Sequence, residues 1–266
     1  MEVEPAMLRC PNCSSELTDE YCARCGQHRV QVDELSARHF VSEVVDEVTS
    51  FRTKFKTLRT LRGLLIPGFL TEEYLAGRRQ PFLSPFKAYL VCAAFFFLSA
   101  PVAGFTLASM LDADRSGELR RLVTVREAER HLDPAVFNLR FDSCVQSVYT
   151  ITLGAVAIAF ALVLQVLFRK HRWPYGAHLV FALHYIWFIY LVTVLAGLSR
   201  RTGASIDVSV LGGYMLILPY LILSLKRVYA ESNGAIVLKG TAVLFLTLVL
   251  NNVASSVAIR VTLALM

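Results

Sequence analysis

Five long apolar segments follow residue 85 and limit what this chain can fold into. They cover residues 86–108, 146–168, 176–198, 206–225 and 236–258. A helix needs roughly 20 apolar residues to cross a hydrocarbon core of about 30 Å. Because backbone polar groups have no water partners inside a bilayer, such segments form helices. The sequence predicts an all-α polytopic membrane protein with about five transmembrane helices over residues 86–266.

The overall composition agrees with this class. Hydrophobic residues make up 55% of the 266-residue chain, and the mean hydropathy is +0.50, more than a soluble core requires. The net charge is +6 and the pI about 9.1, which in a soluble protein would raise nucleic acid as a partner. In a membrane protein, an excess of positive charge is typical, because Lys and Arg are enriched in the cytoplasmic loops. We therefore expect anionic headgroups of the bilayer, and not nucleic acid, as the partner of these residues.

Basic residues also predict the orientation. They gather before the first segment, after the second at Arg169–Arg172, and after the fourth at Lys226 and Arg227. The positive-inside rule then places the N-terminus in the cytosol and the C-terminus outside, although Arg200 and Arg201 disagree. Residues 109–145 become an external loop, with a charged helical stretch from Arg115 to His131. We expect a multi-pass protein of the inner (cytoplasmic) membrane.

Four cysteines near the N-terminus are arranged as two CxxC pairs with eight residues between them. The ligand candidates are Cys10, Cys13, Cys22 and Cys25. This spacing is typical of a tetrahedral Zn²⁺ site, and a redox dithiol rarely has two such pairs so close together. Four sulfurs leave no position for water or substrate, so the zinc would be structural. His28 is a competing ligand that four cysteines make unnecessary.

Residues 1–32 are therefore predicted to form a cytosolic zinc ribbon. The eight residues between the pairs leave room for a small two-stranded hairpin. Gly26 follows the last ligand and suits a backbone turn with positive φ. A unit this small has almost no core, so metal binding would supply most of its folding free energy.

Residues 33–85 form the juxtamembrane part. An amphipathic helix is expected over 33–66, with apolar residues in alternating steps of three and four and a basic second half. Two interpretations stay open: the helix lies on anionic headgroups, or it packs on its own bundle or a twin chain in a homo-oligomer. Pro67-Gly68 ends it, and a short turn follows at Glu72–Ala76, with Thr71 as N-cap and Gly77 after its end.

Two blocks of residues resemble a family of bacterial membrane proteins of unknown function that carry an N-terminal zinc ribbon. One block is the ribbon with its ending Cys25-Gly26-Gln27. The other runs from Pro67-Gly68 through Glu73-Tyr74-Leu75 and Gly77 to Arg79 and Pro85-Phe86. This chain has Phe82 where the family pattern has a tyrosine. The resemblance implies an architecture and no reaction. More loosely, the topology is similar to the Yip1-type trafficking proteins.

The second block contains a candidate interfacial site made of Glu73, Tyr74, Arg78 and Arg79. Two arginines beside Tyr74 are suited to a headgroup phosphate or a protein partner. The alternative is an aromatic and basic anchor that sets the depth of the first span, and aromatic and basic residues are common at this level.

Polar side chains within the apolar segments form the second candidate site. They are Gln165, His178, His184, Asn251 and Asn252. Together they would line a polar cavity for an ion, a proton or a lipid headgroup. The alternative is interhelical hydrogen bonding, favoured because no Asp or Glu lies at mid-membrane depth.

The sequence contains no catalytic motif that we recognise. The favoured hypothesis is a non-enzymatic scaffold or regulatory protein whose ribbon docks a cytosolic protein partner. A small transporter or channel that uses the polar residues of the spans is the alternative, and a lipid-modifying enzyme ranks third.

Overall fold

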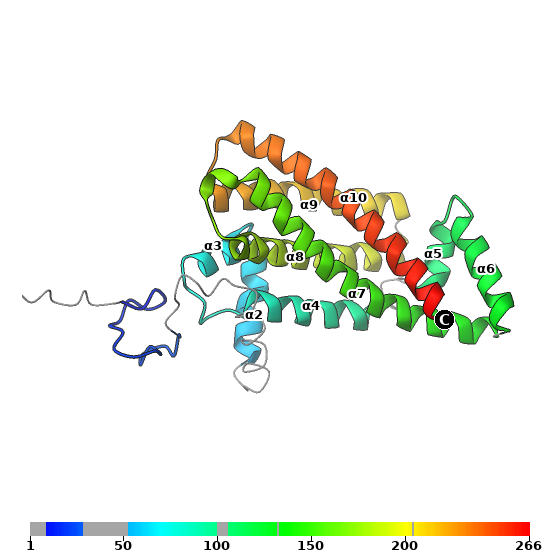
Figure 1. The fold of residues 1–266 in the computed structure, drawn as a ribbon, viewed down its shortest axis with the longest axis horizontal. Helices are drawn as coiled ribbons and strands as arrows, with labels where there is room; N and C mark the ends of the chain where they lie inside the picture. The colour runs from blue at the N-terminus through cyan, green and yellow to red at the C-terminus, as the bar shows by residue number, and fades with distance from the viewer. Residues whose placement is uncertain (1–8, 29–52, 100–105, 132, 204) are drawn as a thin grey trace, which may run out of the picture.

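A computed structural model describes residues 9–28, 53–99, 106–131, 133–203 and 205–266 (Figure 1). This part of the chain is helical and contains no strand longer than an isolated bridge. The helices are α2 (Thr53–Leu64), α3 (Phe69–Leu75), α4 (Pro85–Ser99), α5 (Leu107–Ala113), α6 (Glu118–Arg130), α7 (Pro134–Leu167), the 3₁₀ turn η2 (Arg169–His171), α8 (Tyr175–Arg201), α9 (Ile206–Tyr229) and α10 (Asn233–Leu265).

Four of these helices are long and apolar enough to cross a membrane, namely α7, α8, α9 and α10. The expected first span over 86–108 can be followed only over α4, as far as Ser99, because residues 100–105 lie outside the described residues. The 15 described residues make about 22 Å of helix, less than a hydrocarbon core of about 30 Å. Among the described residues the count of candidate spans is therefore four, with α4 as a shorter apolar helix.

Helix α8 is the centre of the bundle. In its most apolar stretch 67% of the residues are buried, against 33% or less in the other candidate spans. Aromatic rings fill the space around it: Phe188 stacks on Tyr220 of α9 with ring centroids 3.6 Å apart, and Tyr185 stacks on Phe160 of α7 at 5.4 Å. Such ring pairs bury large apolar surfaces in a fixed geometry.

The segment expected as an external loop over 109–145 is mostly helical. Helix α6 confirms the charged helical stretch, and α7 begins at Pro134, twelve residues before the expected start of the second span at 146. The Asp133 side chain accepts a hydrogen bond from the Ala135 N–H, and Pro134 takes the first helical position, a favourable start. A small separate core joins this end of the bundle, with Phe137 and Phe141 of α7 packed near Leu107, Val123 and Leu263.

The ribbon and the C-terminal end of α10 lie at opposite ends of the bundle (Figure 1). At the ribbon end, α3 spans Phe69–Leu75, so the expectation that Thr71 caps a turn at Glu72–Ala76 is wrong. Gly68 is the N-cap residue, with φ +71°, and Thr71 is buried inside the helix. A Cβ on Gly68 would lie 3.0 Å from the Cα and carbonyl oxygen of Ser224, so glycine lets α3 approach the α9 backbone.

Helix α2 is the described part of the amphipathic helix expected over 33–66, and residues 33–52 lie outside the described residues. Its packed side contains Thr60, Gly63 and Leu64, which are buried. The leucines of the expected apolar stripe, Leu58 and Leu61, are exposed. The stripe therefore faces away from the bundle in this part. Figure 1 shows that α2 runs across the long axis of the spanning helices.

Candidate metal centre

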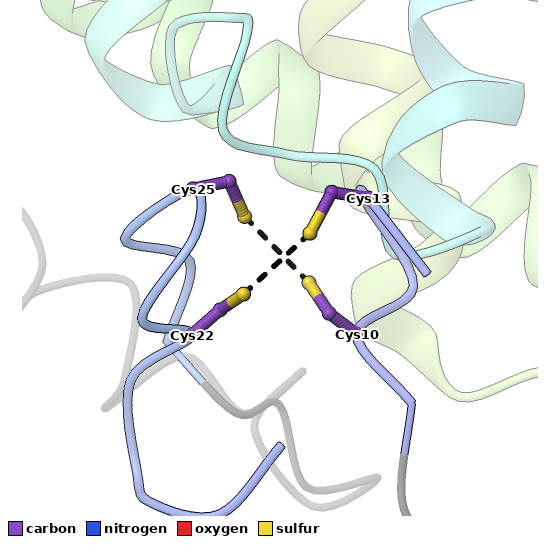
Figure 2. Close-up of side chains that lie close together, drawn as sticks. All are labelled: Cys10, Cys13, Cys22 and Cys25. Atoms are coloured by element: carbon purple, nitrogen blue, oxygen red, sulfur yellow. Dashed lines mark hydrogen bonds between the residues drawn. The ribbon is translucent and has the colours of Figure 1, made fainter. Parts of the chain in front are cut away.

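Four cysteine sulfurs converge on one point at the end of the bundle that carries α2 and α3. The Sγ atoms of Cys10, Cys13, Cys22 and Cys25 all lie within 4.8 Å of one another (Figure 2). Cys10 and Cys25 are 3.6 Å apart, and Cys13 and Cys22 are 3.5 Å apart. A tetrahedral ion with metal–sulfur bonds of about 2.3 Å separates its sulfurs by about 3.8 Å. The four cysteines could therefore hold a metal ion with little adjustment.

The two CxxC turns have the same backbone design. In the first, the Ser14 N–H donates to the Cys10 carbonyl at 2.8 Å; in the second, the Gly26 N–H donates to the Cys22 carbonyl at 2.7 Å. Ser14 has φ +60° and Gly26 has φ +71°, which confirms the positive φ expected at Gly26. Each turn thus supplies two sulfurs from a closed loop of backbone hydrogen bonds.

The expected two-stranded hairpin between the cysteine pairs does not form. Instead each turn is closed by its own isolated bridge, Arg9 with Glu16 and Tyr21 with His28. The turns satisfy their backbone groups locally, so the residues between them need no ladder. His28 packs its ring edge-on against Tyr21, with centroids 4.9 Å apart, and is not one of the four converging ligands.

Ser15 adds a hydroxyl to the sulfur cluster. Its Oγ lies 2.9 Å from Cys13 Sγ and 3.1 Å from Cys22 Sγ. Hydrogen bonding from this hydroxyl lowers the pKa of Cys22 to about 6 and also lowers the pKa of Cys13. Burial raises the pKa of Cys10 to about 11. The Ser15 hydroxyl thus favours the thiolate form of Cys13 and Cys22, whereas burial disfavours the thiolate of Cys10.

Gln27 fastens the metal-site turns to the membrane domain. Its side chain is 5% exposed, and its Nε2 donates to the Gly77 carbonyl at 2.6 Å. Its Oε1 accepts from the backbone N–H groups of Arg79 and Gln80, each at 3.2 Å. Gly77 has φ +82°, and a Cβ there would lie 3.0 Å from Pro11. One amide thus recognises the loop between α3 and α4 through three hydrogen bonds.

Gln80 completes this contact. Its Nε2 donates to the Cys25 carbonyl at 2.9 Å, and its Oε1 accepts from Lys56 Nζ of α2 at 3.2 Å. Helix α2 is also held to the loop by Thr60, whose hydroxyl accepts from the Leu83 N–H at 2.9 Å. Neither Gln27 nor Gln80 was expected as a site residue. The signal in the sequence was their place in or beside the two blocks that carry the family resemblance.

The interfacial candidates Glu73, Tyr74, Arg78 and Arg79 bind mainly one another. Arg78 pairs with Glu73 through two hydrogen bonds of 2.6 and 2.7 Å, and this pairing lowers the pKa of Glu73. The Arg79 guanidinium lies 4.2 Å from the centroid of the Tyr74 ring. Tyr74 is buried and packs with Val180. The ring is therefore part of the contact between α3 and α8, and it is not open to a headgroup.

The structure does not bring the five polar candidates of the spans together. His184 hydrogen-bonds to Thr71 of α3 at 3.0 Å, and His178 to Tyr229 of α9 at 2.7 Å. Asn251 accepts from Tyr149 of α7 at 2.9 Å. Asn252 is exposed and donates to the Leu248 carbonyl of its own helix, and Gln165 is half-buried on α7. Of these five only Asn251 lines the large cavity of the bundle.

Comparison with known families gives one match. A model described as "Protein of unknown function (DUF3667)" matches residues 56–97, the stretch that contains most of α2, all of α3 and most of α4. No curated protein and no solved structure matches the chain. The matched stretch is thus similar to a family of unknown function and includes Gly77, Arg79 and Gln80, which receive Gln27. The likeness to Yip1-type proteins stays a prediction.

Proposed function

We propose that this protein is a non-enzymatic membrane protein that presents a rigid platform at the cytosolic face of the inner membrane. The platform consists of the metal-site turns (residues 9–28), α2, α3 and the loop between α3 and α4. The observation that carries the proposal is the docking of Gln27 on Gly77, Arg79 and Gln80, which joins the turns to the loop between α3 and α4 through three partly buried hydrogen bonds. A unit held in this way is suited to binding a partner in a fixed position.

The metal of the platform is zinc in a structural role. Thiolate ligands and tetrahedral spacing suit Zn²⁺, and four sulfurs leave no coordination position for water or substrate. The ion would close the two turns, and Ser15 would orient its hydroxyl toward the sulfurs. Elemental analysis of the purified protein should give one zinc per chain, and Cys22→Ser should lose it. A protein that folds without any metal would contradict this assignment.

Charge supports a cytosolic location for the platform. Its end of the bundle carries the exposed arginines Arg59 and Arg62 of α2, together with Arg169 and Lys170 after α7. Lys and Arg are enriched on the cytoplasmic side of membrane proteins. The C-terminal end of α10 lies at the opposite end of the bundle and would be external (Figure 1).

Helix α2 would bind the anionic leaflet. Its outer side combines Leu58 and Leu61, 50% and 39% exposed, with Arg59 and Arg62. It runs across the axis of the spans, which is the direction of the membrane plane (Figure 1). An apolar stripe beside basic residues is typical of helices that lie among anionic headgroups. The structure gives less support to the transporter alternative, because only one of its five predicted polar residues, Asn251, lines the large cavity.

A photocrosslinking amino acid at Leu61, in protein expressed in its native membrane, tests the position of α2. Illumination should give adducts with phospholipid, mainly anionic species, and Arg59→Gln combined with Arg62→Gln should lower their yield several-fold. The matched control places the same crosslinker at Glu20, an exposed residue of the metal-site turns, where no lipid adduct is expected. An adduct with the mass of two chains would favour the twin-chain alternative and overturn the leaflet contact.

A further inference from the structure

A large cavity lies among the spanning helices, away from the platform. It has a volume of about 410 Å³ and is lined by α7, α8, α9 and α10, with Met110 of α5 at one end. It is partly open to the surroundings of the bundle, so it is a cleft between the helices and not an enclosed void. Pockets for small ligands have volumes of roughly 300–1,000 Å³. The volume of this cavity is therefore large enough for a small ligand.

The lining excludes charged ligands. None of the described residues around the cavity is Asp, Glu, Lys, Arg or His. A phosphate, carboxylate or ammonium group would enter without an opposite charge, which is costly in a region of low dielectric. Apolar surface makes up most of the wall, with contributions from Leu153, Ile217 and Leu244.

The two amide side chains of the lining, Gln146 and Asn251, lie in the part of the cavity nearer α5. On α7 the lining residues run from Val145 to Val156, and on α10 from Leu244 to Ile259. At 1.5 Å per residue these stretches are about 17 and 23 Å long. Both amides are therefore in one part of the cavity, its polar end, although hydroxyl groups of Tyr185 and Thr247 lie in the other part.

The polar end holds a hydrogen-bonded pair. The Tyr149 hydroxyl donates to Asn251 Oδ1 at 2.9 Å, and both residues line the cavity. This bond orients the Asn251 amide and directs its Nδ2 as a donor. A carbonyl oxygen is the matching acceptor. The Gln146 side chain, on a residue that is 6% exposed, adds a second amide to the same end.

We infer that this cavity binds one acyl chain of an uncharged lipid, with its ester or hydroxyl head at Gln146 and Asn251. The chain extends toward Leu153 and Leu244, in contact with side chains from four helices. This site goes beyond the proposed platform, since it uses none of the platform residues and lies in the half of the bundle nearer α5. The two proposals can therefore fail separately.

Equilibrium binding of radiolabelled mono-oleoylglycerol to the full-length, zinc-loaded protein in detergent tests the ligand class. We expect saturable binding of one molecule per chain. Oleate at pH 8, with the same chain and a charged head, should bind at least tenfold more weakly. Oleate that binds as tightly as the glycerol ester would overturn the assignment of an uncharged head.

Two neighbouring glycines of α9 test the location. Gly213 lines the cavity, and a Cβ there meets only Val192, at 3.6 Å, so Gly213→Leu places a larger side chain into the space. This variant should lose at least tenfold in affinity. Gly212→Leu is the matched control, because a Cβ at Gly212 meets nothing within 4 Å and this residue is not part of the lining. Equal affinity of the two variants would overturn the site.

Two neighbouring asparagines of α10 test the head group. Asn251→Leu should weaken binding of mono-oleoylglycerol about three- to tenfold, because the oriented amide is lost. Asn252→Leu changes an exposed residue outside the lining and should leave the affinity unchanged. A reduction in both variants, or in neither, would remove Asn251 from the site and contradict the proposed polar end.

Discussion

Thr71 and His184 share a buried hydrogen bond of 3.0 Å, although 113 residues separate them in the chain. The bond joins the seven-residue helix α3 to α8, the central helix of the bundle. Thr71 is 2% exposed and His184 is 5% exposed, so neither group has water as a replacement partner. The pair is a buried polar contact that holds α3 against α8.

Thr71→Val removes the hydroxyl and keeps the shape of the side chain. His184 then keeps a buried ring nitrogen without its partner, which costs about 1–3 kcal/mol. The thermal midpoint of the protein in detergent should fall, whereas Thr71→Ser should stay near the wild-type value. A stable Thr71→Val protein would mean that the hydrogen bond contributes nothing to the position of α3.

Gln27→Leu tests the contact between the metal-site turns and the spans. The backbone N–H groups of Arg79 and Gln80 lose their acceptor, so hydrogen exchange at these two amides should become faster. The four cysteines are unchanged, and zinc content should stay at one per chain. Glu20→Gln, at an exposed position of the turns, is the control and should leave exchange unaltered.

Ser15→Ala tests the hydroxyl beside the sulfurs through pH. Without that hydrogen bond the pKa of Cys22 should rise from about 6 toward the ordinary thiol value of 9.0. Zinc binds thiolates, so protons compete with it more strongly when the pKa is higher. In a chelator competition, the pH at which half of the zinc is released should move upward in Ser15→Ala. Thr18→Ala, which removes a hydroxyl away from the sulfurs, should release zinc at the wild-type pH.

Gly68→Ala and Gly117→Ala form a matched pair, because both glycines have φ +71°. Alanine in this conformation costs about 1–2 kcal/mol. At Gly117 nothing lies within 4 Å of the added Cβ, so this cost is the whole effect. At Gly68 the Cβ also meets the α9 backbone at 3.0 Å, and the loss of thermal stability should be clearly larger. Equal losses would show that α3 and α9 separate without cost.

The sequence predicted the parts of this protein whose causes are local. The spacing of Cys10, Cys13, Cys22 and Cys25 identified the converging sulfurs, because each CxxC turn is closed by its own backbone hydrogen bonds. The long apolar segments identified α7 to α10 for the same reason, since a helix satisfies its backbone internally. The match to a family of unknown function covers residues 56–97, which include the second block of the resemblance.

What the sequence could not supply depends on contacts across long distances. The spacing around Thr71 is that of an N-cap, but its partner His184 lies in another helix. Nothing in the sequence around Gln27 indicates that its amide binds the Gly77 carbonyl, 50 residues away, at 2.6 Å. The cavity is a space between four helices, and no single helix contains a pattern for it.

Gln80 lies between two groups of different character. Its amide binds the carbonyl of Cys25, which also supplies a sulfur, and the ammonium of Lys56, on the helix with the exposed leucines. The side chain of Gln80 therefore connects Cys25 to Lys56 of α2 through two hydrogen bonds. If the four cysteines hold the zinc ion that we propose, removing it would free the backbone of Cys25 and weaken one of the restraints on α2. The metal content of the site and the orientation of α2 would then be coupled through the side chain of Gln80.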